Sequence, residues 1–251
     1  MVSSPPRRRL DLRLVESQLA PTRERAQSLI AAGLVEVDGA RAVSAAQPVG
    51  ESSALRVLGR DHPYASRAGA KLAGGLDHFM VDPAGRVALD AGASTGGFTD
   101  VLLARGAERV YAVDVGRGQL DSRLAGDNRV VVLDRTNLRH LEQLPGPPPS
   151  LVTLDLSFIS LRLVLERVCA LAAPGTDVVA LFKPQFELGR DAIGKGGVVT
   201  DQERARAGAD ALLAWAVERF GCIAQPPVPA AVRGTKGNQE WMLHLRLRGA
   251  P

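Results

Sequence analysis

From Ser66 onward, the sequence alternates short β-branched apolar runs with stretches of helical periodicity. Each of the first five runs ends in a polar or glycine-rich turn, and helices are expected near 97–105, 161–173 and 202–220. This alternation predicts an α/β fold with a doubly wound, parallel sheet, whose ligands bind at the carboxyl ends of the strands. The runs are Arg86–Asp90, Arg109–Val115, Arg129–Leu133, Leu151–Leu156, Asp177–Lys183 and Glu240–Leu247.

Residues 8–58 show a different pattern, of two short helices followed by a hairpin. A first amphipathic helix begins around Leu10 and ends near Pro21, and Thr22 is suited to cap a second helix that ends at Gly33. The dipeptide Asp38-Gly39 between alternating residues indicates a tight hairpin. We therefore predict a small N-terminal α+β domain.

A proline-containing stretch separates the two patterns. We predict a domain at 8–58, a linker at 59–65 and a larger domain at 66–248.

Positive charge is concentrated at the N-terminus. Residues 1–60 contain nine Arg, no Lys and six acidic residues, so they hold +3 of the formal net charge of +4. Such a segment favours contact with a polyanion, because neutralising phosphates releases counterions. On charge alone, a solvated Arg-rich terminus is an equal alternative.

Composition narrows the class of protein. The two cysteines, Cys169 and Cys222, lie far apart in apolar runs and are expected to be buried and reduced. The four histidines show no metal-ligand spacing, so we predict no metal site. Neither a signal peptide nor an apolar stretch of about 18 residues is found, which predicts a cytoplasmic protein without membrane contact. We also expect a monomer.

A glycine-rich turn follows the first run of the larger domain and leads into a helix. Glycines there let the backbone approach a ligand closely, although their spacing differs from the nicotinamide pattern. Acidic residues close the next two strands, where they are expected to meet the ribose hydroxyls and the adenine amino group. Together these features are typical of S-adenosylmethionine sites. The candidate cofactor-binding residues are Asp90, Gly92, Ser94, Gly96, Gly97, Phe98, Asp114 and Asp134.

Four polar residues stand at predicted strand or helix ends that face this crevice. Lys71 opens the helix before the first strand, and Glu240 opens the last strand. Asp155 and Lys183 end the fourth and fifth strands, and Pro184 stiffens the chain directly after Lys183.

Motifs along nearly the whole chain carry a family resemblance. The stretch "RLDLRLVESQLAPTRERAQSLIAAGLVEVDGARA" resembles the S4 RNA-binding domain. With "DAGASTGGFTD", "DLSFISL", "KPQFE" and "KGNQEW", the chain resembles the TlyA family, also called hemolysin A, over about 8–247. The resemblance implies a Rossmann-like methyltransferase domain that uses S-adenosylmethionine. It also implies a ribosomal-RNA cytidine 2′-hydroxyl as acceptor, and resistance to cyclic-peptide ribosome inhibitors when the modification is lost.

The resemblance gives roles to the candidate residues. Lys71, Asp155, Lys183 and Glu240 match the Lys-Asp-Lys-Glu tetrad of ribose 2′-O-methyltransferases. We predict Lys183 as general base, with Lys71 nearby keeping part of its amine neutral, and Asp155 as the residue that orients it. Glu240 is expected to hold Lys71 or the ribose, and Lys71 to stabilise the developing alkoxide. The candidate RNA-binding residues are Arg7, Arg8, Arg9, Arg13, Arg23 and Arg25.

The chain departs from the family pattern at three places. Ala68-Gly69 stands where two glycines are typical, and the segment 234–237 lacks a common proline. The sequence also stops soon after Leu247, whereas relatives that modify both ribosomal subunits tend to carry a further helix. We therefore expect a large-subunit (23S) target only.

Three other functions compete with this interpretation. Arg9-Leu10-Asp11 is similar to a catalytic string of S4-containing pseudouridine synthases, but no such catalytic domain surrounds it. A non-catalytic RNA-binding or ribosome-assembly factor with a degenerate cofactor fold would fail to bind S-adenosylmethionine. A membrane-lytic hemolysin would need an insertion element, and only core-like segments are found.

Overall fold

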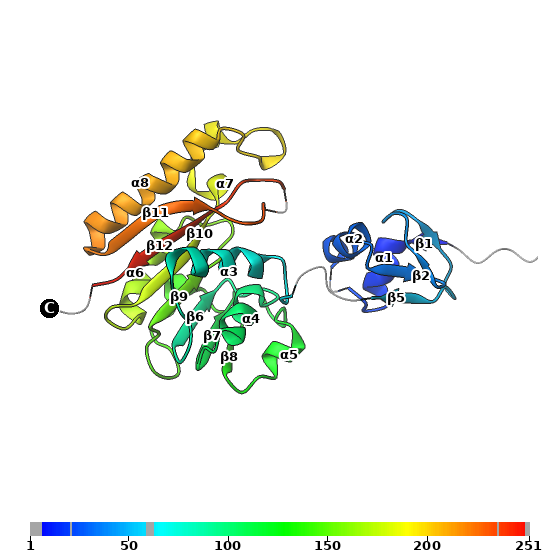
Figure 1. The fold of residues 1–251 in the computed structure, drawn as a ribbon, viewed down its shortest axis with the longest axis horizontal. Helices are drawn as coiled ribbons and strands as arrows, with labels where there is room; N and C mark the ends of the chain where they lie inside the picture. Colours follow the sequence, from blue (N-terminus) through cyan, green and yellow to red (C-terminus); the bar gives the residue numbers. More distant parts are fainter. Residues whose placement is uncertain (1–6, 21, 59–62, 235, 249–251) are drawn as a thin grey trace, which may run out of the picture. The chain divides into compact units, whose positions relative to one another are not determined.

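The computed structural model describes residues 7–20, 22–58, 63–234 and 236–248 (Figure 1). The chain divides into two compact units, with the division between Pro63 and Tyr64. This division falls inside the predicted linker, of which residues 59–62 lie outside the described residues.

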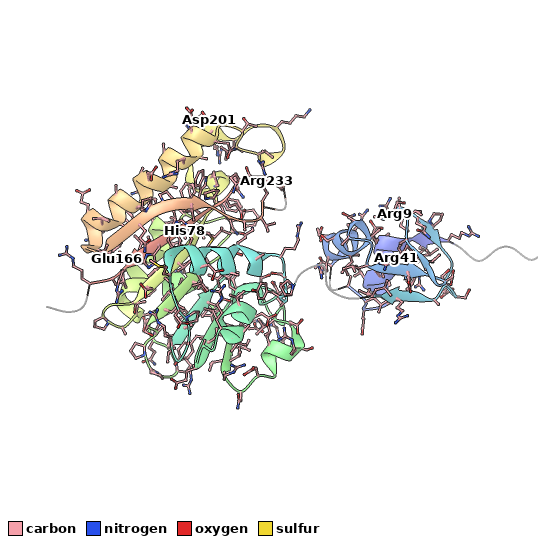
Figure 2. The ribbon with its side chains drawn as sticks, in the orientation of Figure 1. Arg9, Arg41, His78, Glu166, Asp201 and Arg233 are labelled. Atoms are coloured by element: carbon pink, nitrogen blue, oxygen red, sulfur yellow. The ribbon has the colours of Figure 1, made fainter. Side chains whose placement is uncertain are left out.

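The N-terminal unit packs two helices against short strands around one apolar core. Strand β1 pairs with β4, and β3, β2 and β5 form an antiparallel sheet in that order. Leu10, Leu14 and Leu29 are buried at its centre. Arg9 of β1 and Arg41 of β3 are labelled in Figure 2. The elements are β1 (Arg8–Arg9), α1 (Leu10–Glu16), α2 (Arg23–Ala31), β2 (Val35–Val37), β3 (Ala40–Arg41), β4 (Pro48–Val49) and β5 (Leu55–Val57).

The turn chemistry predicted for this unit is confirmed. The Thr22 hydroxyl accepts a hydrogen bond from the Arg25 backbone N–H, which caps α2. Asp38 and Gly39 both have positive φ angles, of 53° and 83°, as a type I′ hairpin requires. The first helix is shorter than predicted, because the left-handed φ of Gln18 follows its end at Glu16. Pro21 lies outside the described residues.

The larger unit contains a seven-stranded sheet in the order β11-β12-β10-β9-β6-β7-β8. Strands β10, β9, β6, β7 and β8 are parallel neighbours, and β12 runs antiparallel to both β10 and β11. The strands are β6 (Val87–Ala91), β7 (Arg109–Val113), β8 (Val130–Leu133), β9 (Leu151–Leu154), β10 (Asp177–Phe182), β11 (Ile223–Pro229) and β12 (Trp241–Arg246).

Helices cover both faces of the sheet, which confirms the doubly wound α/β fold (Figure 1). Leu72 of α3 and Val101 of α4 pack on one face with Val179, and Leu165 of α6 and Leu212 of α8 pack on the other with Val178. The helices are α3 (Ala68–Phe79), α4 (Gly97–Ala104), α5 (Ser122–Ala125), α6 (Arg162–Leu171), α7 (Pro184–Glu187) and α8 (Gln202–Phe220), with single 3₁₀ turns at Leu138–His140, Arg190–Ala192 and Lys195–Gly197.

Two features of the sheet differ from the sequence prediction. Strand β11 was not expected, because Pro226, Pro227 and Pro229 are unfavourable inside a sheet; its position at the edge of the sheet accommodates them. The last strand is antiparallel rather than parallel, because the described residues of the segment 230–240, between β11 and β12, form no crossover helix.

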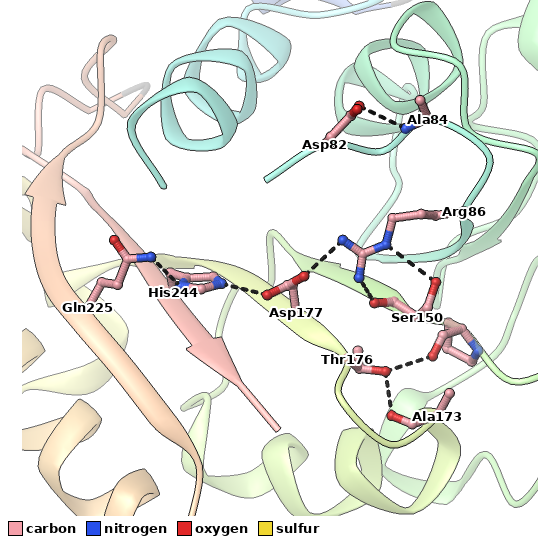
Figure 3. Close-up of polar contacts among 10 residues, drawn as sticks. Asp82, Ala84, Arg86, Ser150, Ala173, Thr176, Asp177, Gln225 and His244 are labelled. Atoms are coloured by element: carbon pink, nitrogen blue, oxygen red, sulfur yellow. Dashed lines mark hydrogen bonds and ion pairs between the residues drawn. The ribbon is translucent and has the colours of Figure 1, made fainter. Parts of the chain in front are cut away.

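A polar network crosses the amino edge of the parallel strands (Figure 3). Gln225 of β11 contacts His244 of β12 at 3.1 Å, and His244 Nε2 lies 3.0 Å from Asp177 Oδ1 of β10. Arg86, directly before β6, donates to Asp177 Oδ2 at 2.8 Å and also to Ser150, directly before β9. This edge network therefore links five adjacent strands. Burial by itself would raise the pKa of Asp177. The hydrogen bonds from His244 and Arg86 have the larger combined effect, so the pKa lies below its ordinary value.

Candidate active site

Lys71 and Glu240 form a buried ion pair at the carboxyl edge of the sheet. Lys71 lies in the first turn of α3, and Glu240 immediately precedes β12. Lys71 Nζ lies 2.6 Å from Glu240 Oε2, and the two side chains are only 10% and 4% exposed. Two residues 169 positions apart are thereby joined, and neither charge is left without its counter-ion.

Lys183 and Asp155 form a second ion pair at the same edge. Lys183 follows β10 directly, where Pro184 opens α7, and Asp155 follows β9. Lys183 Nζ lies 2.6 Å from Asp155 Oδ1 and donates to Ser157 Oγ at 3.0 Å. The lysine amine is therefore held by a carboxylate and a hydroxyl from the neighbouring strand end.

The strand register brings the four residues to one end of the sheet. Phe182 is paired with Trp241, so Lys183 and Glu240 are the next residues along β10 and β12. Ala180 is paired with Leu154, which places Asp155 beside the end of β10. The structure thus groups all four predicted tetrad residues, with each lysine paired to one carboxylate. Glu240 binds Lys71, the first of the two partners expected for Glu240.

The glycine turn lies next to this edge, between β6 and α4. Gly92 has a φ of +84°, and a Cβ atom there would lie 2.4 Å from the Asp155 carbonyl oxygen. Gly96 adopts a φ of +92° as the residue that caps α4, and a Cβ on Gly97 would lie 3.0 Å from the Gly69 nitrogen. The turn therefore runs close to both Asp155 and the start of α3, and a side chain at any of these glycines would fill the space beside it.

We predict that Gly92→Ala lowers affinity for S-adenosylmethionine by more than tenfold, because the new methyl group must displace either the turn or the Asp155 backbone. The left-handed backbone adds about 1–2 kcal/mol of destabilisation. Calorimetric titration with S-adenosylmethionine and urea unfolding measure the two effects.

Gly175→Ala is the matched control for this variant. Gly175 has a similar φ of +77°, but no atom lies within 4 Å of the position of its Cβ. It should lose about the same stability from backbone strain and keep wild-type cofactor affinity. Equal affinity of the Gly92 and Gly175 variants would contradict the role given to the turn.

Asp90 lies beneath the turn and is fully buried. Its carboxylate accepts hydrogen bonds from Thr99 Oγ1 at 2.6 Å and from Thr153 Oγ1 at 3.1 Å. Burial, with a smaller contribution from the negative charge of Asp155, raises the pKa of Asp90 to about 7. The hydrogen bonds from the two threonine hydroxyls act in the opposite direction and lower it. Asp90 is thus placed to support the turn from within the core, by joining α4 to β9.

The raised pKa of Asp90 predicts a pH-dependent stability. Between about pH 4 and 7 the native state binds a proton that the unfolded state has lost, so the free energy of unfolding falls as pH rises and then levels off. The contribution is on the order of 4 kcal/mol, at about 1.4 kcal/mol per pH unit. Asp90→Asn should abolish this part of the slope in urea unfolding across pH 4–8; parallel curves for variant and wild type would refute it.

The other cofactor candidates occupy different environments. Asp114 follows β7, and its two carboxylate oxygens accept backbone hydrogen bonds from Ser94 at 2.8 Å and Gly116 at 2.7 Å. Asp134 follows β8 and accepts a hydrogen bond from the Gly118 nitrogen at 2.8 Å. Phe98, in contrast, is 2% exposed and packs in the core between α4 and the sheet.

The arrangement fits an adenosyl cofactor. The glycine turn leaves space that any side chain would fill, and Asp114 orders the backbone at Ser94 and Gly116 while remaining partly exposed. A carboxylate at the end of the second parallel strand is a suitable acceptor for ribose hydroxyls.

Within the described residues, no group of three or more His, Cys, Asp or Glu side chains could hold a metal ion. In the same part of the chain, no helix has the length and apolar character needed to cross a membrane.

The candidate RNA-binding arginines lie in the N-terminal unit. Arg7 is exposed, and Arg8 pairs with Glu16. Arg13 contacts Glu16 at 3.3 Å and donates to the Glu51 carbonyl at 3.0 Å. Arg9 and Arg23 share the carboxylate of Asp11, and the backbone N–H of Arg25 is used in the cap of α2.

Sequence reasoning missed several residues at the site. Ser157 binds Lys183, and Thr99 and Thr153 bind Asp90. Phe158 is 90% exposed, has a φ of +63° and lies 4.9 Å from the ring of Phe186. The motif "DLSFIS" contained Ser157 and Phe158, but the sequence had no signal for the contacts that they make.

Comparison with known proteins finds relatives for both units of the chain. The family model of FtsJ-like methyltransferases matches residues 64–247, and that of the S4 domain matches residues 8–55. A Mycobacterium tuberculosis protein named 16S/23S rRNA (cytidine-2′-O)-methyltransferase TlyA is 45% identical, covering 96% of this chain and 90% of the relative.

Solved structures show the same fold. A hemolysin-named structure from Streptococcus thermophilus is 36% identical with a TM-score of 0.78, covering 99% of this chain and 91% of that one. The N-methyltransferase NodS of Bradyrhizobium japonicum, solved with S-adenosyl-L-homocysteine, is 15% identical with a TM-score of 0.50 and covers 74% and 89% of the two chains. From its two domain matches and its 45% identical relative, the chain belongs to the TlyA (hemolysin A) family of FtsJ-like methyltransferases with an N-terminal S4 domain.

Proposed function

We propose that this protein transfers a methyl group from S-adenosylmethionine to the 2′-hydroxyl of a cytidine in ribosomal RNA. The observation that carries the proposal is the pairing of Lys71 with Glu240 and of Lys183 with Asp155 at one edge of the sheet, beside the glycine turn. The acceptor follows from the M. tuberculosis relative, whose name specifies a cytidine 2′-oxygen of rRNA.

Each ion pair has a separate task in this reaction. When bound, the cofactor supplies a methyl group on a positively charged sulfur. Lys183 is assigned as the general base for the proton that the ribose 2′-oxygen loses during attack, and Asp155 keeps its Nζ in place through the 2.6 Å contact. The Lys71 ammonium, fixed by Glu240, stabilises the negative charge that develops on the 2′-oxygen.

Holding the cofactor is the task of the turn and of the strand ends behind it. Gly92, Gly96 and Gly97 provide the close approach, and Ser94 belongs to the same turn. Asp114 is assigned to the ribose and Asp134 to the adenine. Asp90 supports the turn from the core, and Phe98 contributes through packing.

The arginines of the S4 unit supply the contact with the RNA backbone. The target is large-subunit rRNA, and the protein acts as a monomer in the cytoplasm, where ribosomal subunits are found. The residues assigned to this contact are Arg7, Arg8, Arg9, Arg13, Arg23 and Arg25.

Purified protein should methylate isolated large ribosomal subunits with radiolabelled S-adenosylmethionine, and mapping of ribose methylation should find one modified cytidine. Comparable methyl incorporation into small subunits would exclude the large-subunit restriction. Absence of ribose methylation on either subunit and on free rRNA would overturn the proposed function. The molar mass of the purified protein, measured by light scattering, tests whether it is a monomer.

A further inference from the structure

Asp11 is a fully buried carboxylate in α1 that gathers three side chains of the N-terminal unit. Arg9 approaches it with two N–H groups, from Nε to Oδ1 at 3.0 Å and from Nη2 to Oδ2 at 2.9 Å. Arg23 Nε and Gln27 Nε2 each donate to Oδ2 at 2.9 Å. Arg9 lies before α1 and Arg23 opens α2, so one carboxylate fixes guanidinium groups from two elements.

Both arginines keep a large part of their side chains in solvent. Arg9 is 43% exposed and Arg23 is 49% exposed, whereas the Asp11 side chain is 0% exposed. Arg9 uses Nε and Nη2 toward the carboxylate, and Arg23 uses Nε. Their inner edges are therefore bound to Asp11, and the exposed parts carry the remaining N–H donors. Because the contacts hold both side chains, less rotamer freedom is lost when a ligand binds to these donors.

We infer that Asp11 is a positioning residue for RNA binding: it holds Arg9 and Arg23 as a preorganised pair whose outer N–H groups bind the phosphodiester backbone. The inference rests on the proposed function, because it takes RNA to be the partner of this unit. Guanidinium groups suit this task, since their planar array of donors matches phosphate oxygens in a way that an ammonium does not.

Positioning and simple electrostatics predict opposite effects of removing the Asp11 charge. Asp11→Asn adds one unit to the formal net charge of +4, so charge alone would tighten binding to a polyanion. If Asp11 holds the arginines, the same substitution weakens binding, because the amide presents only one acceptor oxygen and loses the charge-assisted contacts.

The first experiment measures binding of the full-length protein to a 23S rRNA transcript over a series of salt concentrations. Asp11→Asn should weaken binding by about tenfold and lower the slope of log affinity against log salt by about one to two, since each lost phosphate contact contributes about 0.7–0.9. Glu24→Gln is the matched control: it removes one exposed acidic charge beside Arg23 in α2 and should leave binding unchanged or slightly tighter. Unchanged or tighter binding by Asp11→Asn would overturn the inference.

A second pair of variants covers the case in which Asp11→Asn unfolds the N-terminal unit, which thermal melting detects. Arg9→Lys and Arg23→Lys conserve charge at exposed positions and remove only the guanidinium geometry. Each should raise KM for RNA, while kcat at saturating RNA and affinity for S-adenosylmethionine stay unchanged. Wild-type KM in both variants would refute the inference. If the wild-type protein itself binds no rRNA, the proposed function fails instead.

Discussion

Replacing Lys183 by alanine is expected to lower kcat for RNA methylation by about 10²- to 10⁴-fold, the usual contribution of a positioned general base. Lys183 Nζ is fixed by Asp155 at 2.6 Å and by Ser157 at 3.0 Å, at the same sheet edge as the glycine turn. Affinity for S-adenosylmethionine should stay close to that of the wild type, because the turn is separate from this lysine. Single-turnover methyl transfer and calorimetric titration distinguish the two properties.

Arg246→Ala is the control for Lys183→Ala. Arg246 is an exposed cation on β12, paired in register with Asp177 at the opposite edge of the sheet. The Arg246→Ala variant, like Lys183→Ala, removes one positive charge from the larger unit, but it should leave kcat unchanged. Near-wild-type methyl transfer by Lys183→Ala, with normal cofactor binding, would show that the base is another residue.

Replacing Glu240 by glutamine is expected to lower the free energy of unfolding by about 3–5 kcal/mol, because it leaves the Lys71 ammonium buried without a counter-ion. The two side chains are 10% and 4% exposed, so solvent cannot compensate for the lost carboxylate. Urea unfolding measures the change. Asp210→Asn is the control: its partner Arg206 is 41% exposed, and loss of that surface pair should change stability by less than about 1 kcal/mol.

The double variant Lys71→Met/Glu240→Leu separates stability from catalysis. Apolar side chains of similar size often replace a buried ion pair without loss of stability. The double variant should therefore regain most of the stability lost in Glu240→Gln, yet remain inactive in methyl transfer. Recovery of activity together with stability would mean that the pair has only a structural role.

Much of this fold can be predicted from sequence because it depends on neighbouring residues. The Thr22 cap, the Asp38-Gly39 turn and the first five strands of the large sheet are set by local chemistry and periodicity. The tetrad could be located because residues after parallel strands meet at one edge. The pairing of Asp155 with Lys183 was expected as well, but the choice of Glu240 between Lys71 and the ribose was left open, since the contact of Lys71 with Glu240 joins α3 to the segment before β12.

Other features depend on contacts that no sequence pattern records. Three prolines obscured β11, which the edge position tolerates. Phe98 looked like a ligand contact because it lies in the turn motif, but the first turn of α4 directs it into the core. Asp11 lay inside a family motif, but the sequence did not show that it is the shared acceptor of Arg9, Arg23 and Gln27. These contacts form only when α2 packs against α1.

The edge network of Arg86, Asp177, His244 and Gln225 lies at the end of the sheet opposite the tetrad. A reporter group can therefore be attached at that end. Beside this network lies a cavity of 360 Å³ lined in part by Met80, a residue that is 88% exposed. Cys169 is half-buried, with its pKa raised to about 11 by burial, and Cys222 is buried, so both native thiols should react slowly with labels. Met80→Cys and Val43→Cys, the latter at an 86% exposed position of the S4 unit, would therefore label each unit at one defined site without altering the tetrad.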